Sequence, residues 1–282
     1  MKGLIVTADD FGAAREVNDA VERAHRDGIL TAASLMVSAP AAADAVARAR
    51  HMPSLRVGLH LVLAEGRSTL PPATIPDLVD ASGNFRTDMA RAGASMFFRP
   101  RVRKQLAEEI AAQFEAFAAT GLKLDHVNAH KHFHLHPTIA TILIEEGRKH
   151  GMKAARVPRE RRATLEAIEP GTTSLGDSAL APFTAMLAAR LKGAGLTVPD
   201  QVFGLKWSGA MTTARLAGLV SNLPEGLSEI YLHPATAEHF QGSAPGYRYC
   251  DELAALLDSA VAAAARSPSV RLGGFGDFPA RR

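Results

Sequence analysis

The sequence has almost no cysteine: Cys250 is the single one among 282 residues. One thiol can form neither an intramolecular disulfide nor a cysteine-rich zinc site. Cysteine usage of this kind is typical of a reducing compartment, so we expect a cytoplasmic protein. The apolar run at the N-terminus covers only a few residues before two carboxylates, which is too short for a secretory signal.

Long apolar runs and basic stripes are also lacking. No window approaches the 18 or so apolar residues of a membrane span, although contact with a lipid at the inner membrane surface is still open to such a chain. The net charge is only +3, and the densest basic group lies at residues 99–104 with two phenylalanines beside it. Nucleic-acid sites interleave a longer basic stripe with aromatics, so we expect no nucleic-acid partner.

What the sequence does contain is enough apolar residues, 47%, for a sizeable core. Segments typical of strands alternate with segments of helical periodicity along the whole chain. The predicted strands are Leu4–Ala8, Thr31–Val37, Arg56–Leu63, Leu124–His130, Lys153–Val157, Asp200–Leu205, Glu229–Leu232 and Val270–Gly273. The predicted helices are Ala14–Arg26, Ala41–Arg50, Arg101–Ala119, Pro137–His150, Ala179–Leu191, Thr213–Ser221 and Asp251–Arg266.

Seven or eight such units without a break in composition indicate one α/β domain, residues 1–282, with a parallel sheet. The length fits a distorted (β/α) barrel of the TIM type with about seven strands, and a doubly wound open sheet is the alternative. Residues 64–100 are rich in Gly, Pro, Ser and Thr and have little periodicity. A connection of that length predicts a lid or a binding loop.

Five of the eleven histidines fall between residues 126 and 136. In an extended strand they share one face with Asn128, and apolar residues occupy the other face. Barrel active sites lie at the carboxyl ends of the strands, where this row would end. Alternate residues are more than about 6 Å apart, so we expect one or two of these histidines to bind a metal. A histidine-rich surface strand without a metal is the alternative.

Two further strand ends carry candidate ligands. Asp9 and Asp10 follow the first apolar run, and His60 lies within the third. Taken singly, the carboxylates could cap a helix and His60 could be a core histidine. Together with the histidine row they predict an Asp/His/His site for a catalytic divalent metal with open positions for water. Of two adjacent carboxylates, one can bind the metal and the other can act as a base.

Another strand ends in His233-Pro234. Because all strand ends of a barrel converge, His233 could face the metal from the opposite wall as a general acid. A core or loop histidine is the alternative at this position.

In combination these stretches resemble the YdjC/ChbG family of carbohydrate deacetylases. The resemblance runs through residues 7–12, 28–34, 58–61, 130–134, Arg156 and 233–234. Stretches 125–137 and 198–211 resemble the hopanoid-biosynthesis-associated branch called HpnK. The resemblance implies a distorted (β/α) barrel that removes the N-acetyl group from an N-acetylglucosamine-type sugar, carried on a hopanoid lipid in that branch.

The resemblance also implies roles for single residues. It makes Asp10, His60 and His130 the metal ligands, Asp9 the base and His233 the acid. The remaining polar residues, expected to contact the substrate or the ligands, are Asn128, His132, His134 and Arg156. Many family members carry Asp-Ser where this chain has Asn128-Ala129, and the lost charge either weakens metal binding or marks the branch.

The donor set and the family disagree on the metal. Two imidazoles and one carboxylate suit zinc, cobalt, nickel or iron, whereas magnesium prefers all-oxygen shells, yet the family is usually described as magnesium-dependent. We expect one divalent metal, with zinc or another transition metal favoured and magnesium as the alternative. Met96–Phe98, beside Arg99, Arg101 and Arg103, could receive a lipid, unless these three residues pack a helix into the core.

Several other functions stay open at this point. The same site could deacetylate soluble chito-oligosaccharides, or it could bind a metal or sugar after losing catalysis. A phosphoesterase would usually need a second carboxylate set for two metals, and the predicted strand ends do not provide one. A homodimer is also open.

Overall fold

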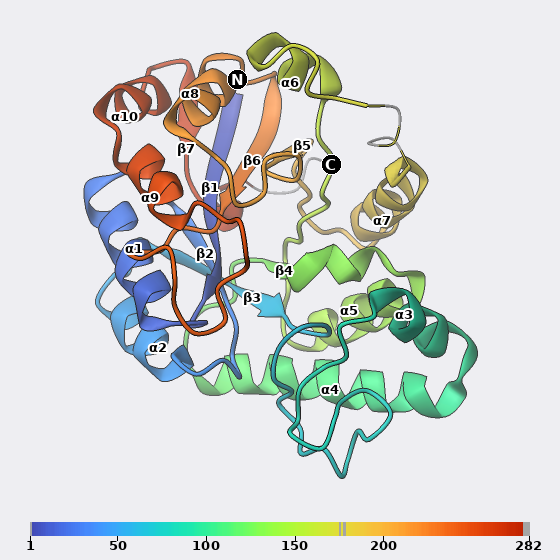
Figure 1. The fold of residues 1–282 in the computed structure, drawn as a ribbon. Helices are drawn as coiled ribbons and strands as arrows, with labels where there is room; N and C mark the ends of the chain where they lie inside the picture. The colour runs from blue at the N-terminus through green and yellow to red at the C-terminus, as the bar shows by residue number, and fades with distance from the viewer. Residues whose placement is uncertain (1, 175, 177–178, 279–282) are drawn as a thin grey trace.

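The computed structural model describes residues 2–174, 176 and 179–278. In this part of the chain, seven parallel strands form one curled sheet with the order β4-β3-β2-β1-β6-β5, and β7 pairs with β1 (Figure 1). The strands are β1 (Lys2–Phe11), β2 (Ala32–Leu35), β3 (Arg56–Leu61), β4 (Val127–Ala129), β5 (Gln201–Phe203), β6 (Gly226–Leu232) and β7 (Val270–Leu272).

The longest strand, β1, is central in the sheet. It pairs with β6 along Lys2–Ala8, while β7 and β2 share its other edge, β7 at Lys2–Leu4 and β2 at Thr7–Phe11. Its apolar residues are fully buried because helices cover the outside of the sheet. Asp9 and Asp10 therefore emerge at the carboxyl end of the central strand.

Helices surround the sheet, as predicted for an α/β domain (Figure 1). They are α1 (Arg15–Asp27), α2 (Ala42–Arg50), α3 (Met89–Phe98), α4 (Pro100–Ala119), α5 (Pro137–Lys149), α6 (Arg162–Ile168), α7 (Ala181–Gly193), α8 (Thr213–Ser221), α9 (Tyr249–Leu257) and α10 (Ser259–Ala265), with 3-10 turns η1 (His130–Leu135) and η3 (Phe275–Asp277). The prediction of a distorted barrel with about seven strands is confirmed. None of the described helices combines the length and apolar content needed to cross a membrane.

The predicted strand Lys153–Val157 is wrong. Ala155 bridges Val127 and Ala154 bridges Thr197, each as an isolated pair. Pro158, which directly follows the predicted strand, has no backbone N–H to donate to a neighbouring strand. The wall between β4 and β5 is therefore irregular, which makes the sheet a curled half-barrel.

The histidine segment also departs from the prediction of an extended strand. β4 ends at Ala129, and His130 begins the 3-10 turn η1. Within that turn, Lys131 and His132 have left-handed φ values of 55° and 53°. The imidazoles beyond residue 130 therefore point in different directions, and the row on one face does not form.

The helices differ from the prediction in two smaller respects. The predicted helix Asp251–Arg266 is interrupted at Asp258, whose side chain caps α10 by accepting from the N–H groups of Ala260 and Val261. Helix α3 lies inside residues 64–100, which lack a clear period in the sequence, and Asp88 caps it.

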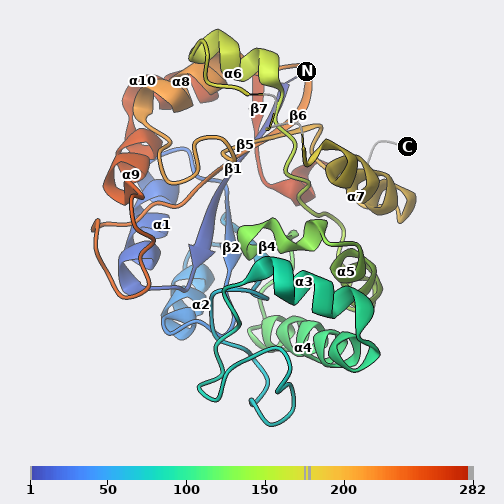
Figure 2. The same cartoon turned by 45° about the vertical axis from the view of Figure 1, so that its right-hand side comes forward.

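The connection between β3 and α3 is ordered and is attached to α4 by buried polar groups. Glu109 accepts hydrogen bonds from the backbone N–H of Thr69 and Leu70, and Gln113 both donates to and accepts from the backbone of Val62. Figure 2 shows α3, α4 and α5 stacked together, with the connection beside α4. Whether this connection acts as a lid stays a prediction.

Candidate active site

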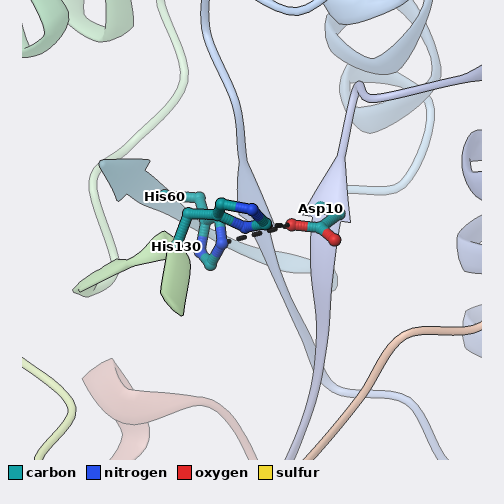
Figure 3. Close-up of side chains that lie close together, drawn as sticks. All are labelled: Asp10, His60 and His130. Carbon is teal, nitrogen blue, oxygen red and sulfur yellow. Dashed lines mark hydrogen bonds and ion pairs between the residues drawn. The ribbon is translucent and has the colours of Figure 1, made fainter. Parts of the chain in front are cut away.

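Asp10 is the first of three side chains that meet at the carboxyl ends of the strands. Its φ of 61° is left-handed, a conformation that costs about 1–2 kcal/mol for a residue other than glycine. Oδ1 of Asp10 lies 3.3 Å from Nε2 of His60 on β3 and 3.2 Å from Nδ1 of His130, where η1 begins. Figure 3 shows the two imidazoles converging on this carboxylate.

These three residues form a group that could hold a metal ion. Their ligand atoms all lie within 4.8 Å of one another. A tetrahedral zinc with bonds of 2.0–2.1 Å has ligand–ligand edges of about 3.3–3.4 Å, close to the two observed distances. Nε2 of His60 is buried and has no hydrogen-bond partner, although buried polar atoms are almost always satisfied. The donor set therefore fits a divalent cation.

Asn128 on β4 determines which nitrogen of His60 faces that group. The amide Nδ2 of Asn128 donates to Asp9 and Ser34, so its Oδ1 is the atom that faces His60. Nδ1 of His60 lies 2.6 Å from this oxygen and donates its proton there. The other ring nitrogen, Nε2, is left with a free lone pair, as a metal ligand requires.

A glycine in β3 allows this strand to lie close to the residue that precedes β4. A Cβ on Gly58 would lie 2.5 Å from the His126 ring, so this strand position accepts no side chain. His126 itself is structural: it hydrogen-bonds Asp125 and Ser34 and stacks on Phe275.

Asp9 has different surroundings from its neighbour. The buried guanidinium of Arg156 donates to both carboxylate oxygens of Asp9 and also to Glu229. Burial alone would raise the pKa of Asp9, but the charge of Arg156 holds that pKa well below its usual range. His130 similarly lowers the pKa of the Asp10 carboxyl against the effect of burial. Both carboxylates are therefore ionised at neutral pH.

His132 and His134, the next two histidines of this segment, contact buried groups of the neighbouring elements. Nε2 of His132 lies 2.9 Å from the hydroxyl of Tyr231, and Nε2 of His134 lies 2.9 Å from the carbonyl oxygen of Arg156. Burial lowers the pKa of His132 well below its usual range and that of His134 to about 4. Both imidazoles are therefore neutral at pH 7, and their hydrogen bonds fix the positions of Tyr231 and of the backbone at Arg156.

His233 follows β6 and lines a cavity together with the three residues of the metal-ligand group. Its backbone N–H donates to the buried carboxylate of Glu252, and its ring lies edge-on to Tyr247 with centroids 5.2 Å apart. Burial lowers the pKa of the His233 imidazole, although Asp10 and Asp9 act in the other direction. The cavity has a volume of about 490 Å³ and also contains Asp9, Asp10, His60 and His130.

A larger cavity, about 690 Å³, lies at the amino ends of the strands and is lined partly by Arg56, Val57 and Asp125. Asp125 is already satisfied by the backbone N–H groups of Phe275 and Gly276, and Arg56 pairs with Asp277. Ligands of barrels bind at the other end of the strands, so the smaller cavity is the candidate active site.

The sequence interpretation did not include Glu229, Tyr231, Glu252, Glu65 or Lys131. A signal existed for the first two, since residues 229, 231 and 233 share one face of a strand. Glu229 accepts a hydrogen bond from Arg156. The guanidinium carbon of Arg156 lies 4.4 Å from the centroid of the Tyr231 ring. The other three had no distinguishing pattern.

Comparisons with known proteins show the family of this chain. A family model described as YdjC-like protein matches residues 3–267. The chain belongs to the YdjC-like family. The resemblance inferred from the sequence is thereby confirmed at the level of the family.

Similar proteins include carbohydrate deacetylases. That of Geobacillus stearothermophilus is 29% identical over 280 residues, 97% of each chain. That of Brevibacillus brevis is 39% identical over 142 residues, half of this chain and 54% of the relative. That of Vibrio vulnificus strain CMCP6 is 38% identical over 147 residues. These last two matches span about half the length of the relatives.

One solved structure has the same fold along the whole chain. It is the structure of an Enterococcus faecalis protein described as a cellobiose-phosphate cleavage protein. It superposes with a TM-score of 0.73, covers 99% of both chains and shares 22% of the sequence. At this identity the likeness concerns the fold alone.

Proposed function

We propose that this protein is a metal-dependent N-deacetylase of an N-acetylglucosamine-type sugar. The observation that carries the proposal is the group formed by Asp10, His60 and His130 beside an ionised Asp9 in one cavity. The carbohydrate deacetylases among the relatives support the class of substrate.

The metal-ligand group favours zinc or another transition metal, with magnesium as the alternative, because two of the three donors are imidazole nitrogens. When bound, a divalent metal lowers the pKa of water and polarises the acetyl carbonyl. Asn128 keeps the imidazole of His60 in the orientation that such an ion requires.

Asp9 is the proposed base. It is ionised and therefore able to accept the proton of the attacking water. Because Arg156 makes it a weak base, the proton is passed on and does not stay there. Its carboxylate accepts two hydrogen bonds from Arg156 and one from Asn128, so its position is fixed before the substrate arrives.

His233 is the proposed acid. Burial makes the resting imidazole neutral, so it would receive the proton that Asp9 takes from the water and donate it to the leaving nitrogen. The C–N bond breaks, the hydroxyl of water joins the acetyl carbon, and the products are acetic acid, which ionises to acetate, and a free amine. One proton leaves the water and one reaches the amine, so the reaction balances.

A hopanoid-linked sugar is the finer part of the proposal. It rests on the HpnK-like stretches and on the end of α3. Met96 is 1% exposed and packs into the core, but Phe97 and Phe98 are 47% and 75% exposed. Exposed arginines follow them, at residues 99, 101 and 103. Exposed aromatics beside cations suit the surface of an anionic membrane, which supports a peripheral location.

The alternatives receive less support. A soluble chito-oligosaccharide would use the same centre without the phenylalanines. A binding protein without catalysis would not need Asp9, which is the group's ionised neighbour. A phosphoesterase with two metals lacks a second cluster, since the described residues contain one group of metal-ligand type.

Acetate release tests the proposal. Metal-depleted protein is reloaded with zinc, cobalt or magnesium and supplied with N-acetylglucosamine, chitobiose or a lipid-linked N-acetylglucosamine. Asp9→Asn should lower kcat at least a hundredfold while metal content stays unchanged. Asp27→Asn, an exposed carboxylate on α1, is the matched control. No acetate from any substrate with any of the metals would contradict the proposed function.

A further inference from the structure

Left-handed backbone is concentrated in the candidate active site. Outside glycine, the described residues with a positive φ are Asp10, Glu65, Lys131 and His132. All four line the 490 Å³ cavity. Asp10 belongs to the metal-ligand group and His132 contacts Tyr231, but the proposed chemistry leaves Glu65 and Lys131 without a role.

Glu65 and Lys131 form an ion pair in the lining of the cavity. Nζ of Lys131 lies 3.0 Å from Oε2 of Glu65, and the two side chains are 40% and 38% exposed. Glu65 begins the long connection after β3, and Lys131 follows the candidate ligand His130. The pair therefore joins the connection to the metal-ligand group.

The stability of the fold does not explain this pair. Left-handed backbone is strained at both residues, whereas an exposed ion pair contributes little to the stability of a fold. The strain therefore exceeds what the pair contributes, and strained residues with no structural gain are typical of functional sites.

We propose that Glu65 and Lys131 bind the hydroxyl groups of a neutral saccharide next to its acetamido group. This inference rests on the proposed function and deepens it. A sugar hydroxyl both donates and accepts hydrogen bonds, so adjacent hydroxyls can donate to the Glu65 carboxylate and accept from the Lys131 ammonium. The half-exposed pair lies within the cavity, where such a sugar ring can reach it.

The charges around the cavity select an uncharged sugar. Among the described residues that line it, Asp9, Asp10 and Glu65 are acidic, and Lys131 is the one lysine or arginine. Glu65 already neutralises Lys131, so a phosphate at this end of the sugar would meet the charge of Glu65 beside a cation that is already paired. Removing Glu65 should expose the lysine and make a phosphorylated sugar more acceptable.

Steady-state kinetics with acetate as the readout tests the pair, using N-acetylglucosamine and N-acetylglucosamine 6-phosphate. Lys131→Met should raise KM for the neutral sugar about tenfold, the value of one charged hydrogen bond, and change kcat less than twofold. Glu65→Gln should lower the preference for the neutral over the phosphorylated sugar at least fivefold. Lys149→Met, which breaks the Lys149–Glu146 pair on α5, is the control.

A second variant separates binding from folding. Glycine accepts a positive φ without strain, so Lys131→Gly should keep or raise the Tm while raising KM as Lys131→Met does. A fall in Tm with unchanged KM would show a purely structural pair and overturn the inference.

Binding of the neutral sugar by calorimetry distinguishes the two proposals. Acetate release by the wild type with an unchanged KM in both lysine variants would overturn the role of the pair alone. Sugar binding that Lys131→Met weakens, without acetate release by the wild type, would support the pair and overturn the deacetylase.

Discussion

Oδ1 of Asn128 lies 2.6 Å from Nδ1 of His60, and the same side chain donates from Nδ2 to Asp9. One amide therefore connects a candidate metal ligand to the proposed base. An amide is suited to this position because it offers an acceptor on one side and donors on the other.

Replacing that amide should weaken metal binding. Asn128→Leu removes both contacts, so His60 is free to change its tautomer and Asp9 loses one donor. We expect metal affinity to fall about 10–100-fold and the free energy of unfolding to fall by about 1–3 kcal/mol. Metal competition titrations and denaturant unfolding measure the two effects. Asn128→Asp keeps an acceptor for His60 and should retain the metal; equal loss in both variants would contradict this role.

Arg156 should be among the most sensitive positions for folding. Arg156→Met leaves the buried carboxylates of Asp9 and Glu229 without their cation. Breaking a buried pair in this way costs about 3–5 kcal/mol. Denaturant unfolding measures the loss, and Arg26→Met, which breaks an exposed pair with Glu22 on α1, should cost less than about 1 kcal/mol. Equal effects of the two variants would rule out the buried network.

Glu252 should make stability depend on pH. Burial, only partly offset by the N–H groups of Met211 and His233, raises its pKa from 4.5 to about 7. A raised folded pKa stabilises the fold below pH 4.5, and this contribution is lost as the pH rises through 7. The shift corresponds to about 3 kcal/mol.

The comparison of the wild type with Glu252→Gln isolates this group, because the variant does not titrate there. Between pH 5 and pH 8 the wild type should lose unfolding free energy relative to the variant. A difference between the two proteins that stays constant with pH would contradict the raised pKa.

The end of α3 should determine binding to anionic membranes. A Phe97→Ser/Phe98→Ser variant should partition to vesicles containing phosphatidylglycerol at least tenfold less than the wild type, because burial of each ring contributes about 2 kcal/mol. Vesicle sedimentation measures the partition. The control is Leu180→Ser/Phe183→Ser, which removes two exposed large hydrophobic residues at the start of α7. Equal partition of both variants and the wild type would contradict membrane binding by Phe97 and Phe98.

The sequence predicted much of the fold because the parallel sheet is buried on both faces and its strands are short apolar runs. It did not predict the irregular segment at Ala154 and Ala155, since isolated bridges leave no periodic signal. It also did not predict the turn after Ala129. There the histidine spacing suited a strand, but tertiary contacts of His132 with Tyr231 and of His134 with Arg156 give η1 its conformation.

The site was predictable where chemistry is concentrated in the sequence. Asp10, His60 and His130 converge as the resemblance to the family implied. Glu65 and Lys131 were not predictable, because each is a single charged residue in a polar stretch. Their pairing depends on backbone conformations that no local residue pattern specifies.

The most direct test of the metal centre is a zinc titration of metal-free protein that follows bound metal and acetate release together. We predict one zinc per chain, with acetate release rising in proportion to occupancy, and neither in His60→Ala. Acetate release at the full rate from protein without metal, or zinc binding that His60→Ala leaves unchanged, would contradict a catalytic metal held by Asp10, His60 and His130.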